Sequence, residues 1–123
     1  MEYTILIVDD QKGVRRLLEE LFKKESWQVY LASDGLEAID MAQELKPDII
    51  LMDMKMPNMD GLEAAEKILA IDQDQYIVIM TAYGEMEIVN KILEVGVKKC
   101  IAKPFDIMVL RDLVKEMVLN KNS

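Results

Sequence analysis

Five polar side chains stand at the ends of apolar runs in this sequence. They are Asp9, Asp10, Asp53, Thr81 and Lys103. Three carboxylates that lie together repel one another unless a cation sits among them. Oxygen donors without histidine or cysteine suit Mg²⁺ better than zinc, and protein-bound magnesium usually takes phosphate oxygens as further ligands. If the chain brings these residues together, their types predict a magnesium site that receives a phosphoryl group.

Asp53 is the predicted nucleophile of this site. A carboxylate can attack phosphorus and form an aspartyl phosphate. During phosphoryl transfer the negative charge spreads over the equatorial oxygens, and the Lys103 ammonium, the Thr81 hydroxyl and Mg²⁺ are all groups that bind such oxygens. We therefore expect positioning and charge neutralisation to supply most of the catalysis.

These side chains can meet only if the apolar runs before them form neighbouring strands. Such runs predict strands at residues 4–8, 28–31, 48–52, 76–80 and 99–102. The third and fourth runs are apolar on both faces, which is typical of a parallel sheet covered by helices on both sides. All strands of a parallel sheet end at the same edge, so the residues that follow them become neighbours.

Segments with the apolar spacing of helices lie between and after these runs. In the first, Val14, Leu17, Leu18, Leu21 and Phe22 recur at helical spacing, and Leu17, Leu18 and Leu21 are expected to face the core. Further helices are predicted around residues 38–45, 61–70, 85–95 and 106–119. Aspartates precede three of them, at Asp34, Asp60 and Asp106, where they can cap the first turn. A short polar tail is expected after residue 119.

The alternation predicts an α/β fold, a three-layer sandwich with one five-stranded parallel sheet and five helices. A chain of 123 residues with 51% hydrophobic content is expected to form one domain, residues 1–123.

The composition excludes several classes of function. A net charge of −8 is unfavourable for binding nucleic acid or an anionic membrane, so the expected partners are proteins. No run approaches the ~20 apolar residues of a membrane span and no basic leader opens the chain, which predicts a cytoplasmic protein. With no histidine in the chain, any phosphohistidine must belong to a partner. The lone cysteine, Cys100, is expected to be a small core residue.

Four motifs resemble those of the two-component response-regulator receiver domains, in the same order and at similar spacing. They are ILIVDD at 5–10, DIILMDMKMPNMDG at 48–61, MTAYG at 80–84 and AKPF at 102–105. The resemblance covers essentially the whole chain. It implies a flavodoxin-like receiver fold with strand order 2-1-3-4-5 and no output domain attached.

The resemblance also implies roles for individual residues. Asp53 matches the phosphorylated aspartate, and Asp9 and Asp10 match the acidic pair that binds Mg²⁺ with Asp53 and the backbone carbonyl of Lys55. Thr81 and Lys103 match the hydroxyl and the lysine that bind the phosphoryl group. The bond between Lys103 and Pro104 is expected to be cis.

Within the family, the chain is most similar to lone receivers that relay phosphoryl groups, including those that control sporulation. This implies a sensor histidine kinase as donor, a histidine phosphotransferase as acceptor and a phosphatase as a further partner. The chain would act as a phosphotransferase rather than as an enzyme of independent turnover. Gln11, Gly13, Val14 and Pro104 are the expected partner-binding residues, with a histidine-bearing helical bundle packed against the helix that begins beside the acidic pair.

One position departs from the family pattern. Many receivers carry an aromatic residue three positions before the lysine, where this chain has Cys100. A small side chain cannot swing a ring inward, so only a modest rearrangement is expected on phosphorylation. Tyr83 and Lys55 stand two residues from Thr81 and Asp53, and we expect them to shield the phosphoryl group from water.

Three other interpretations compete with the phosphorelay. A chemotaxis-like lone receiver would act by binding a target when phosphorylated. A haloacid-dehalogenase-type phosphatase also uses an aspartate and Mg²⁺, but it requires a second aspartate where this chain has Lys55. A flavodoxin-like flavin carrier requires a phosphate-binding loop where this chain has Asp9 and Asp10, whose charge would repel phosphate.

Overall fold

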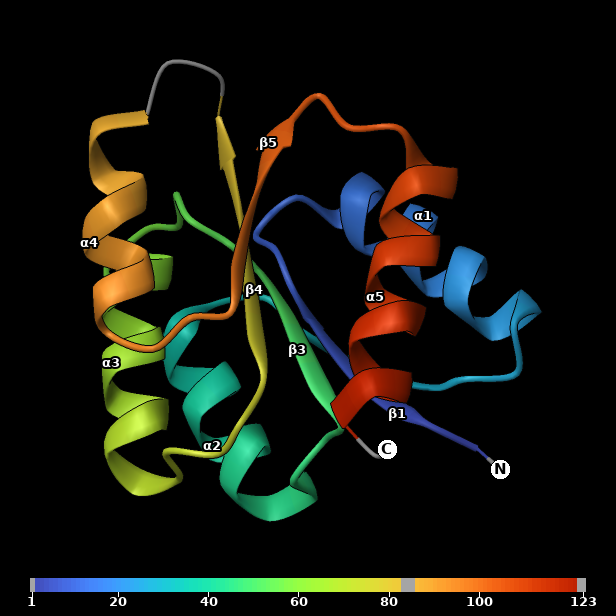
Figure 1. Ribbon diagram of the computed structural model, residues 1–123, viewed down its shortest axis with the longest axis horizontal. Helices are drawn as coiled ribbons and strands as arrows, with labels where there is room; N and C mark the ends of the chain where they lie inside the picture. The colour runs from blue at the N-terminus through green and yellow to red at the C-terminus, as the bar shows by residue number, and fades with distance from the viewer. Residues whose placement is uncertain (1, 83–85, 122–123) are drawn as a thin grey trace.

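The computed structural model describes residues 2–82 and 86–121, in which strands and helices alternate along the chain (Figure 1). The strands are β1 (Thr4–Val8), β2 (Gln28–Ala32), β3 (Ile49–Asp53), β4 (Ile77–Ala82) and β5 (Lys99–Lys103). They form one sheet in the order β2-β1-β3-β4-β5, and every neighbouring pair is parallel. The predicted sheet and its strand order are confirmed.

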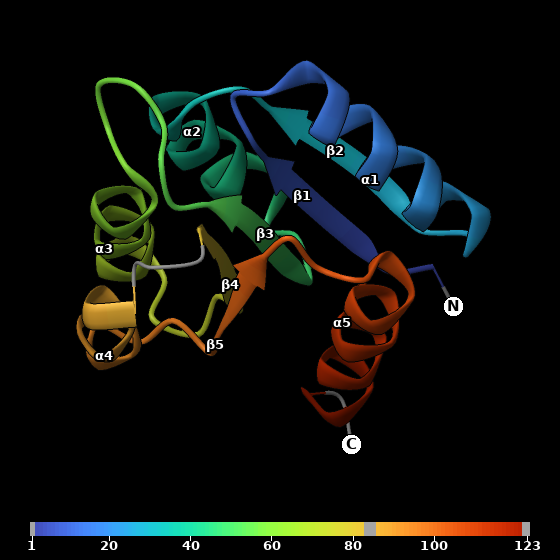
Figure 2. The same cartoon turned by 90° about the horizontal axis from the view of Figure 1, so that it is seen from above.

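The helices of the described residues cover both faces of this sheet. They are α1 (Lys12–Lys24), α2 (Gly35–Leu45), α3 (Gly61–Ile71), α4 (Val89–Glu94) and α5 (Ile107–Lys121), with a 3-10 turn, η1 (Met86–Ile88), before α4. Helices α1 and α5 lie on one face, and α2, α3 and α4 lie on the other (Figures 1 and 2). This is the predicted three-layer sandwich.

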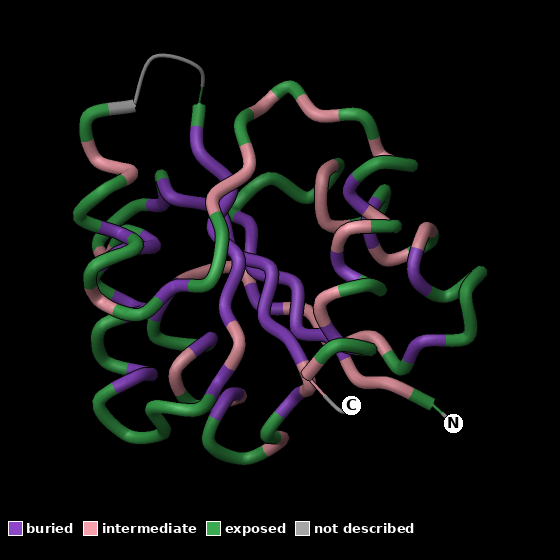
Figure 3. Tube along the Cα trace, viewed as in Figure 1, coloured by how far each residue is buried: buried purple, intermediate pink, exposed green. Residues whose placement is uncertain are grey.

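Alternate residues of each strand divide the core between the two faces. On β1, Ile5 and Ile7 pack toward α1 and α5, whereas Leu6 and Val8 pack toward α2 and α3. All residues of β3 are buried, so its apolar run has no solvent-facing side. Figure 3 shows this buried centre with exposed residues along the outer helices. Burial on both faces explains why the strands read as continuous apolar runs rather than alternating ones.

Aspartate caps set the beginnings of three helices, as the sequence predicts. The side chains of Asp34 and Asp60 accept hydrogen bonds of 2.8 Å from backbone amides three residues later. Asp106 accepts from the amides of Met108 and Val109 at the start of α5. Each cap satisfies a backbone donor that has no partner within its helix.

Two sequence predictions about α1 and α5 are wrong. Leu17 does not face the core but is 45% exposed, because the α1 stripe that meets the sheet runs through Leu18 and Phe22. Helix α5 does not give way to a polar tail after residue 119 but continues to Lys121. The Lys121 ammonium donates to the Asp48 carbonyl oxygen at 2.9 Å and lies over the Tyr76 ring, and these contacts hold the last turn against the sheet.

The fourth helical segment differs from its predicted range of 85–95. Among the described residues, this segment comprises the 3-10 turn η1 and α4, which itself has 6 residues. Tyr83, which the sequence suggested as a shield for the site, lies outside the described residues. None of the helices in the described part of the chain is long and apolar enough to cross a membrane.

Candidate functional site

The parallel register brings the ends of β1, β3, β4 and β5 to one edge of the sheet. Val8 of β1 pairs with Met52 of β3, so Asp9 comes next to the level of Asp53. Asp53 itself pairs with Met80 of β4, and Thr81 is the residue after Met80. Ala82 pairs with Lys103 on the far strand. The five candidate residues thus come from four strand ends that are adjacent in space although they are far apart in sequence.

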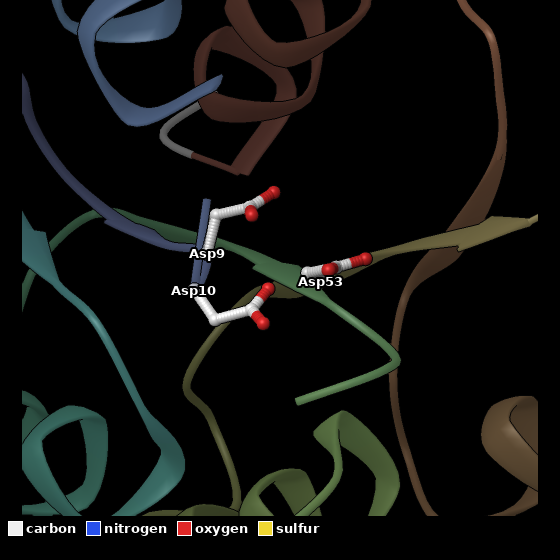
Figure 4. Close-up of side chains that lie close together, drawn as sticks. All are labelled: Asp9, Asp10 and Asp53. Carbon is white, nitrogen blue, oxygen red and sulfur yellow. The ribbon is translucent and has the colours of Figure 1, made fainter. Parts of the chain in front are cut away.

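Three carboxylates gather at this edge. Oxygen atoms of Asp9, Asp10 and Asp53 all lie within 4.8 Å of one another. Figure 4 shows the three side chains at the ends of β1 and β3. Asp9 is fully buried and Asp53 is 8% exposed, whereas Asp10 is exposed to solvent. The cluster therefore has a buried floor and one open side through which a ligand can enter.

The Lys103 ammonium bridges two of these carboxylates. Its Nζ atom lies 3.0 Å from Asp9 Oδ2 and 3.3 Å from Asp53 Oδ1. The ammonium supplies one positive charge against three carboxylates, so the cluster keeps an excess of negative charge in the described structure. A divalent cation would offset that excess.

Asp9 is fixed by contacts with α1. The backbone amide of Gln11 donates to Asp9 Oδ1 at 2.9 Å, and the Arg15 guanidinium donates to the Asp9 backbone oxygen at 2.6 Å. Arg15 was not among the residues that the sequence singled out, because an arginine on a solvent-facing turn resembles an ordinary surface charge. Its contact ties the first turns of α1 to the end of β1.

The cluster perturbs the protonation of Asp53. Burial, followed by the negative charge of Asp9, raises the pKa of Asp53 from 3.8 to about 6, against the opposing effect of Lys103. Burial acts to lower the pKa of Lys103, but its hydrogen bond to Asp9 and the charges of Asp53 and Asp9 outweigh burial, and the pKa is raised. Lys103 therefore stays charged at neutral pH.

Thr81 follows the residue that pairs with Asp53, and Lys55 is two residues after Asp53 in the sequence. Thr81 is 2% exposed, and its hydroxyl donates to the Ile101 carbonyl oxygen at 3.5 Å, a long contact that leaves the hydroxyl able to turn to another acceptor. Lys55 is exposed in the loop after β3. This loop is anchored where the Met54 amide donates to the Met80 carbonyl oxygen at 2.8 Å.

The methionines of this loop serve mainly in packing. Met54 is 4% exposed and Met56 is 9% exposed, and both belong to the core on the α2–α4 side. Cys100 is partly buried against the same core, as expected of a small side chain at the edge of the sheet.

The predicted partner-binding residues follow Asp10 and Lys103 closely in the sequence. Gln11, Gly13 and Pro104 are exposed, and Val14 is partly buried. A methyl group added to Gly13 would meet no atom within 4 Å, so the surface there is open. The bond between Lys103 and Pro104 is cis, as predicted.

A shallow groove lies between α1 and α5. It has a volume of ≈ 250 Å³, and four apolar side chains line it together with charged residues. The apolar residues are Leu17, Leu21, Ile107 and Met108. Sequence periodicity missed this groove, because it assigned Leu17 to the core.

The hollow of ≈ 430 Å³ between α2 and α3 lies away from the carboxylates. Its lining includes Lys46, Asp72 and Gln75, which stand at the ends of α2 and α3 and just before β4. These residues belong to the edge of the sheet where strands begin. A hollow of ≈ 510 Å³, lined by residues that include Glu66, Leu69 and Gly96, contains none of the three carboxylates either.

Residues 5–115 match the family described as Response regulator receiver domain. The chain belongs to this family. Proteins of the family bind Mg²⁺ at a cluster of aspartates, and the group formed by Asp9, Asp10 and Asp53 has the composition of such a cluster.

Among relatives, the chain is 45% identical over 123 residues to Sporulation initiation phosphotransferase F of Bacillus subtilis (strain 168), covering 100% of this chain and 99% of the relative. It is 38% identical over 102 residues to Chemotaxis protein CheY of Thermotoga maritima, covering 82% of this chain and 85% of that one. A receiver domain structure from Methanospirillum hungatei superposes with a TM-score of 0.94 at 24% identity, covering 99% of this chain and 98% of that one, and so supports the fold.

Proposed function

We propose that this protein is a cytoplasmic response regulator of a phosphorelay, in which residues 1–123 form a single receiver domain. In this proposal Asp53 accepts a phosphoryl group from a sensor histidine kinase, and a histidine phosphotransferase then takes the group onward. Control of sporulation is the proposed output. The observation that carries the proposal is the cluster of Asp9, Asp10 and Asp53 around the Lys103 ammonium, at the edge where the strands of a receiver fold end.

Similarity along the chain supports the relay rather than a chemotaxis-like role. The Bacillus subtilis relative is matched over its full length at 45% identity, and its name describes a phosphotransferase of sporulation. The chemotaxis relative from Thermotoga maritima is matched at lower identity and over a smaller share of the chain.

The donor set fits a magnesium ion. Asp9, Asp10 and Asp53 offer hard carboxylate oxygens close to one another, and the Lys55 carbonyl is the proposed fourth protein ligand. When bound, Mg²⁺ would supply positive charge that offsets the carboxylates and the incoming phosphoryl oxygens. The residues of the chain provide the remaining functions.

In the proposed transfer, an Asp53 carboxylate oxygen attacks phosphorus while the bond between phosphorus and the partner's histidine nitrogen breaks. The histidine nitrogen keeps the electron pair of that bond, and Asp53 becomes an aspartyl phosphate. Lys103 already lies 3.3 Å from Asp53 Oδ1, where it can contact an oxygen of the transferred group. The Thr81 hydroxyl can turn from the Ile101 carbonyl to a second oxygen.

The partner's histidine must approach through the open side of the cluster. Gln11, Gly13 and Val14 closely follow the acidic pair and Pro104 follows Lys103, whereas the α1–α5 groove begins at Leu17, further along α1. We propose that a helix carrying the phosphorylatable histidine packs along α1 with apolar contacts in this groove. Such a surface selects the partner, whereas the cluster performs the transfer.

The direct test is phosphorylation with acetyl phosphate and Mg²⁺, followed by mass-spectrometric mapping of the modified residue. Label on Asp53, absent in Asp53→Asn, is the expected result. Label elsewhere, or none in the wild type, rejects the proposed acceptor. Transfer of label from purified protein to a histidine phosphotransferase distinguishes a relay from a chemotaxis-like regulator, which would keep the group until it hydrolyses.

A further inference from the structure

The pentapeptide DGLEA occurs twice in this chain, at residues 34–38 and 60–64. In both copies the aspartate caps a helix and the glycine is its first residue, Gly35 in α2 and Gly61 in α3. The cap bond is 2.8 Å long in each case. The two copies therefore have the same sequence and the same helix start, and the two glycines differ in the atoms that surround them.

The surroundings differ in what a side chain would meet. A Cβ atom on Gly61 would lie 2.5 Å from the backbone oxygen of Asp53 and 3.0 Å from the Cα of Met54. A Cβ atom on Gly35 would instead lie 2.9 Å from the sulfur of Met59. A methionine side chain can rotate away at small cost, whereas backbone atoms in a fully buried strand cannot.

Gly61 also closes the loop that follows the acceptor. Its backbone amide donates to the Met54 carbonyl oxygen at 2.7 Å, and the Met54 amide donates to the Met80 carbonyl oxygen at 2.8 Å. The loop that contains Lys55 therefore begins and ends on residues bonded to each other. Any shift at residue 61 passes directly to the backbone of Asp53 and Met54.

We propose that Gly61 is a positioning residue of the phosphoryl site. The missing side chain allows α3 to begin against the Asp53 carbonyl, which sets the direction of the Asp53 carboxylate and of the loop that carries Lys55. This inference rests on the proposed role of Asp53 as acceptor. Gly35, in the other copy of the pentapeptide, has no such role because a Cβ atom there would meet only side-chain atoms of Met59 and no backbone atom of the site.

The test compares Gly61→Ala with its matched control, Gly35→Ala. We expect Gly61→Ala to weaken Mg²⁺ binding, measured by calorimetric titration, and to slow phosphorylation by acetyl phosphate, each at least about tenfold, since displacements below 1 Å suffice for such losses. Gly35→Ala should stay within about twofold of the wild type in both measurements. Equal effects of the two substitutions, or none from Gly61→Ala, overturn the inference.

A loss of folding in Gly61→Ala is separated from a loss of geometry by repeating both measurements in trimethylamine N-oxide, which favours the folded state. Circular dichroism reports the folded fraction. A folded variant that still binds Mg²⁺ weakly supports positioning, whereas full recovery with folding shows a purely structural role and overturns it. If the wild type itself is not phosphorylated, the proposed function fails, but unequal Mg²⁺ affinities of the two variants still support Gly61 as a positioning residue.

Discussion

Burial and neighbouring negative charge both act against the ionised form of Asp53. Burial is the larger cause, Asp9 is the next, and together they raise the pKa of Asp53 to about 6. The Asp53 carboxylate is thus held in an unfavourable environment when no cation is bound. A cation beside the carboxylate would oppose both causes and favour the ionised form of Asp53.

This pKa shift predicts how the stability of the metal-free protein depends on pH. Between pH 3.8 and about 6 the folded protein binds more protons at Asp53 than the unfolded chain does. The contribution of Asp53 to the free energy of unfolding therefore falls as the pH rises through this window. Asp53→Asn should raise the free energy of unfolding by about 1–2 kcal/mol at pH about 8, a value discounted for partial exposure of the carboxyl group, and by almost nothing near pH about 4.

Urea denaturation of both proteins in EDTA, over that pH range, measures the difference. A gap between them that is independent of pH would show that Asp53 has an ordinary pKa in the folded protein.

At the residue scale, sequence reasoning found the side chains that carry charge but not those that set their positions. Asp9, Asp53 and Lys103 were predictable because parallel strands must end at one edge. Arg15 and Gly61 were not, because one acts through a single contact with a backbone oxygen and the other through the absence of a side chain. The residue type alone does not show which backbone atoms a glycine or an arginine will approach.

At the scale of elements, strands were more predictable than helix faces. The runs in β3 and β4 are buried on both sides, so composition alone identified them. Helix α1 packs against the sheet and lies beside α5. Periodicity could not show which leucines of α1 would contact α5 and which would be exposed to solvent. Leu17 is one of the leucines that periodicity misplaced, because it is 45% exposed and lines the α1–α5 groove.

The exposed Leu17 predicts a variant that separates partner recognition from chemistry. Leu17→Ala should slow phosphoryl transfer from a histidine-bearing partner by about tenfold, because an apolar contact in the docking surface is lost. Phosphorylation by acetyl phosphate needs no docking and should be unchanged. Stability should change by less than about 1 kcal/mol, since the side chain is already 45% exposed.

Leu36→Ala is the matched control, because Leu36 is 63% exposed on α2, outside the groove. Equal transfer rates for the two variants would remove the α1–α5 groove from the docking surface.

Cys100 predicts a limited response of β4, β5, α4 and α5 to phosphorylation. Its side chain is small and already partly buried against the core, so it has no ring to move inward when Thr81 turns to the phosphoryl group. NMR spectra with and without beryllofluoride, which mimics the phosphoryl group, should show large shift changes only in loops next to Asp53. Large changes across the whole face of these four elements would contradict this expectation, and Cys100→Tyr tests whether a ring restores them.

At the scale of the whole molecule, the carboxylate cluster links metal binding to folding. The unfolded chain does not hold Asp9, Asp10 and Asp53 together, so a cation that needs all three binds only the folded state. Free Mg²⁺ at ten times its dissociation constant should therefore raise the free energy of unfolding by about 1.4 kcal/mol. The chain also carries a net charge of −8, so any salt reduces its self-repulsion and stabilises it somewhat.

The two effects are separated by measuring thermal unfolding in MgCl₂ and in NaCl at equal ionic strength. The wild type should be more stable in MgCl₂ by an amount that saturates with concentration, as binding at one site requires. Asp10→Asn and Asp40→Asn each remove one negative charge, but only Asp10 is a proposed magnesium ligand. Asp10→Asn should therefore lose most of the extra stability in MgCl₂, whereas Asp40→Asn, at an exposed position of α2, should keep it. Identical curves in the two salts for the wild type would show that screening alone acts and that the cluster holds no magnesium.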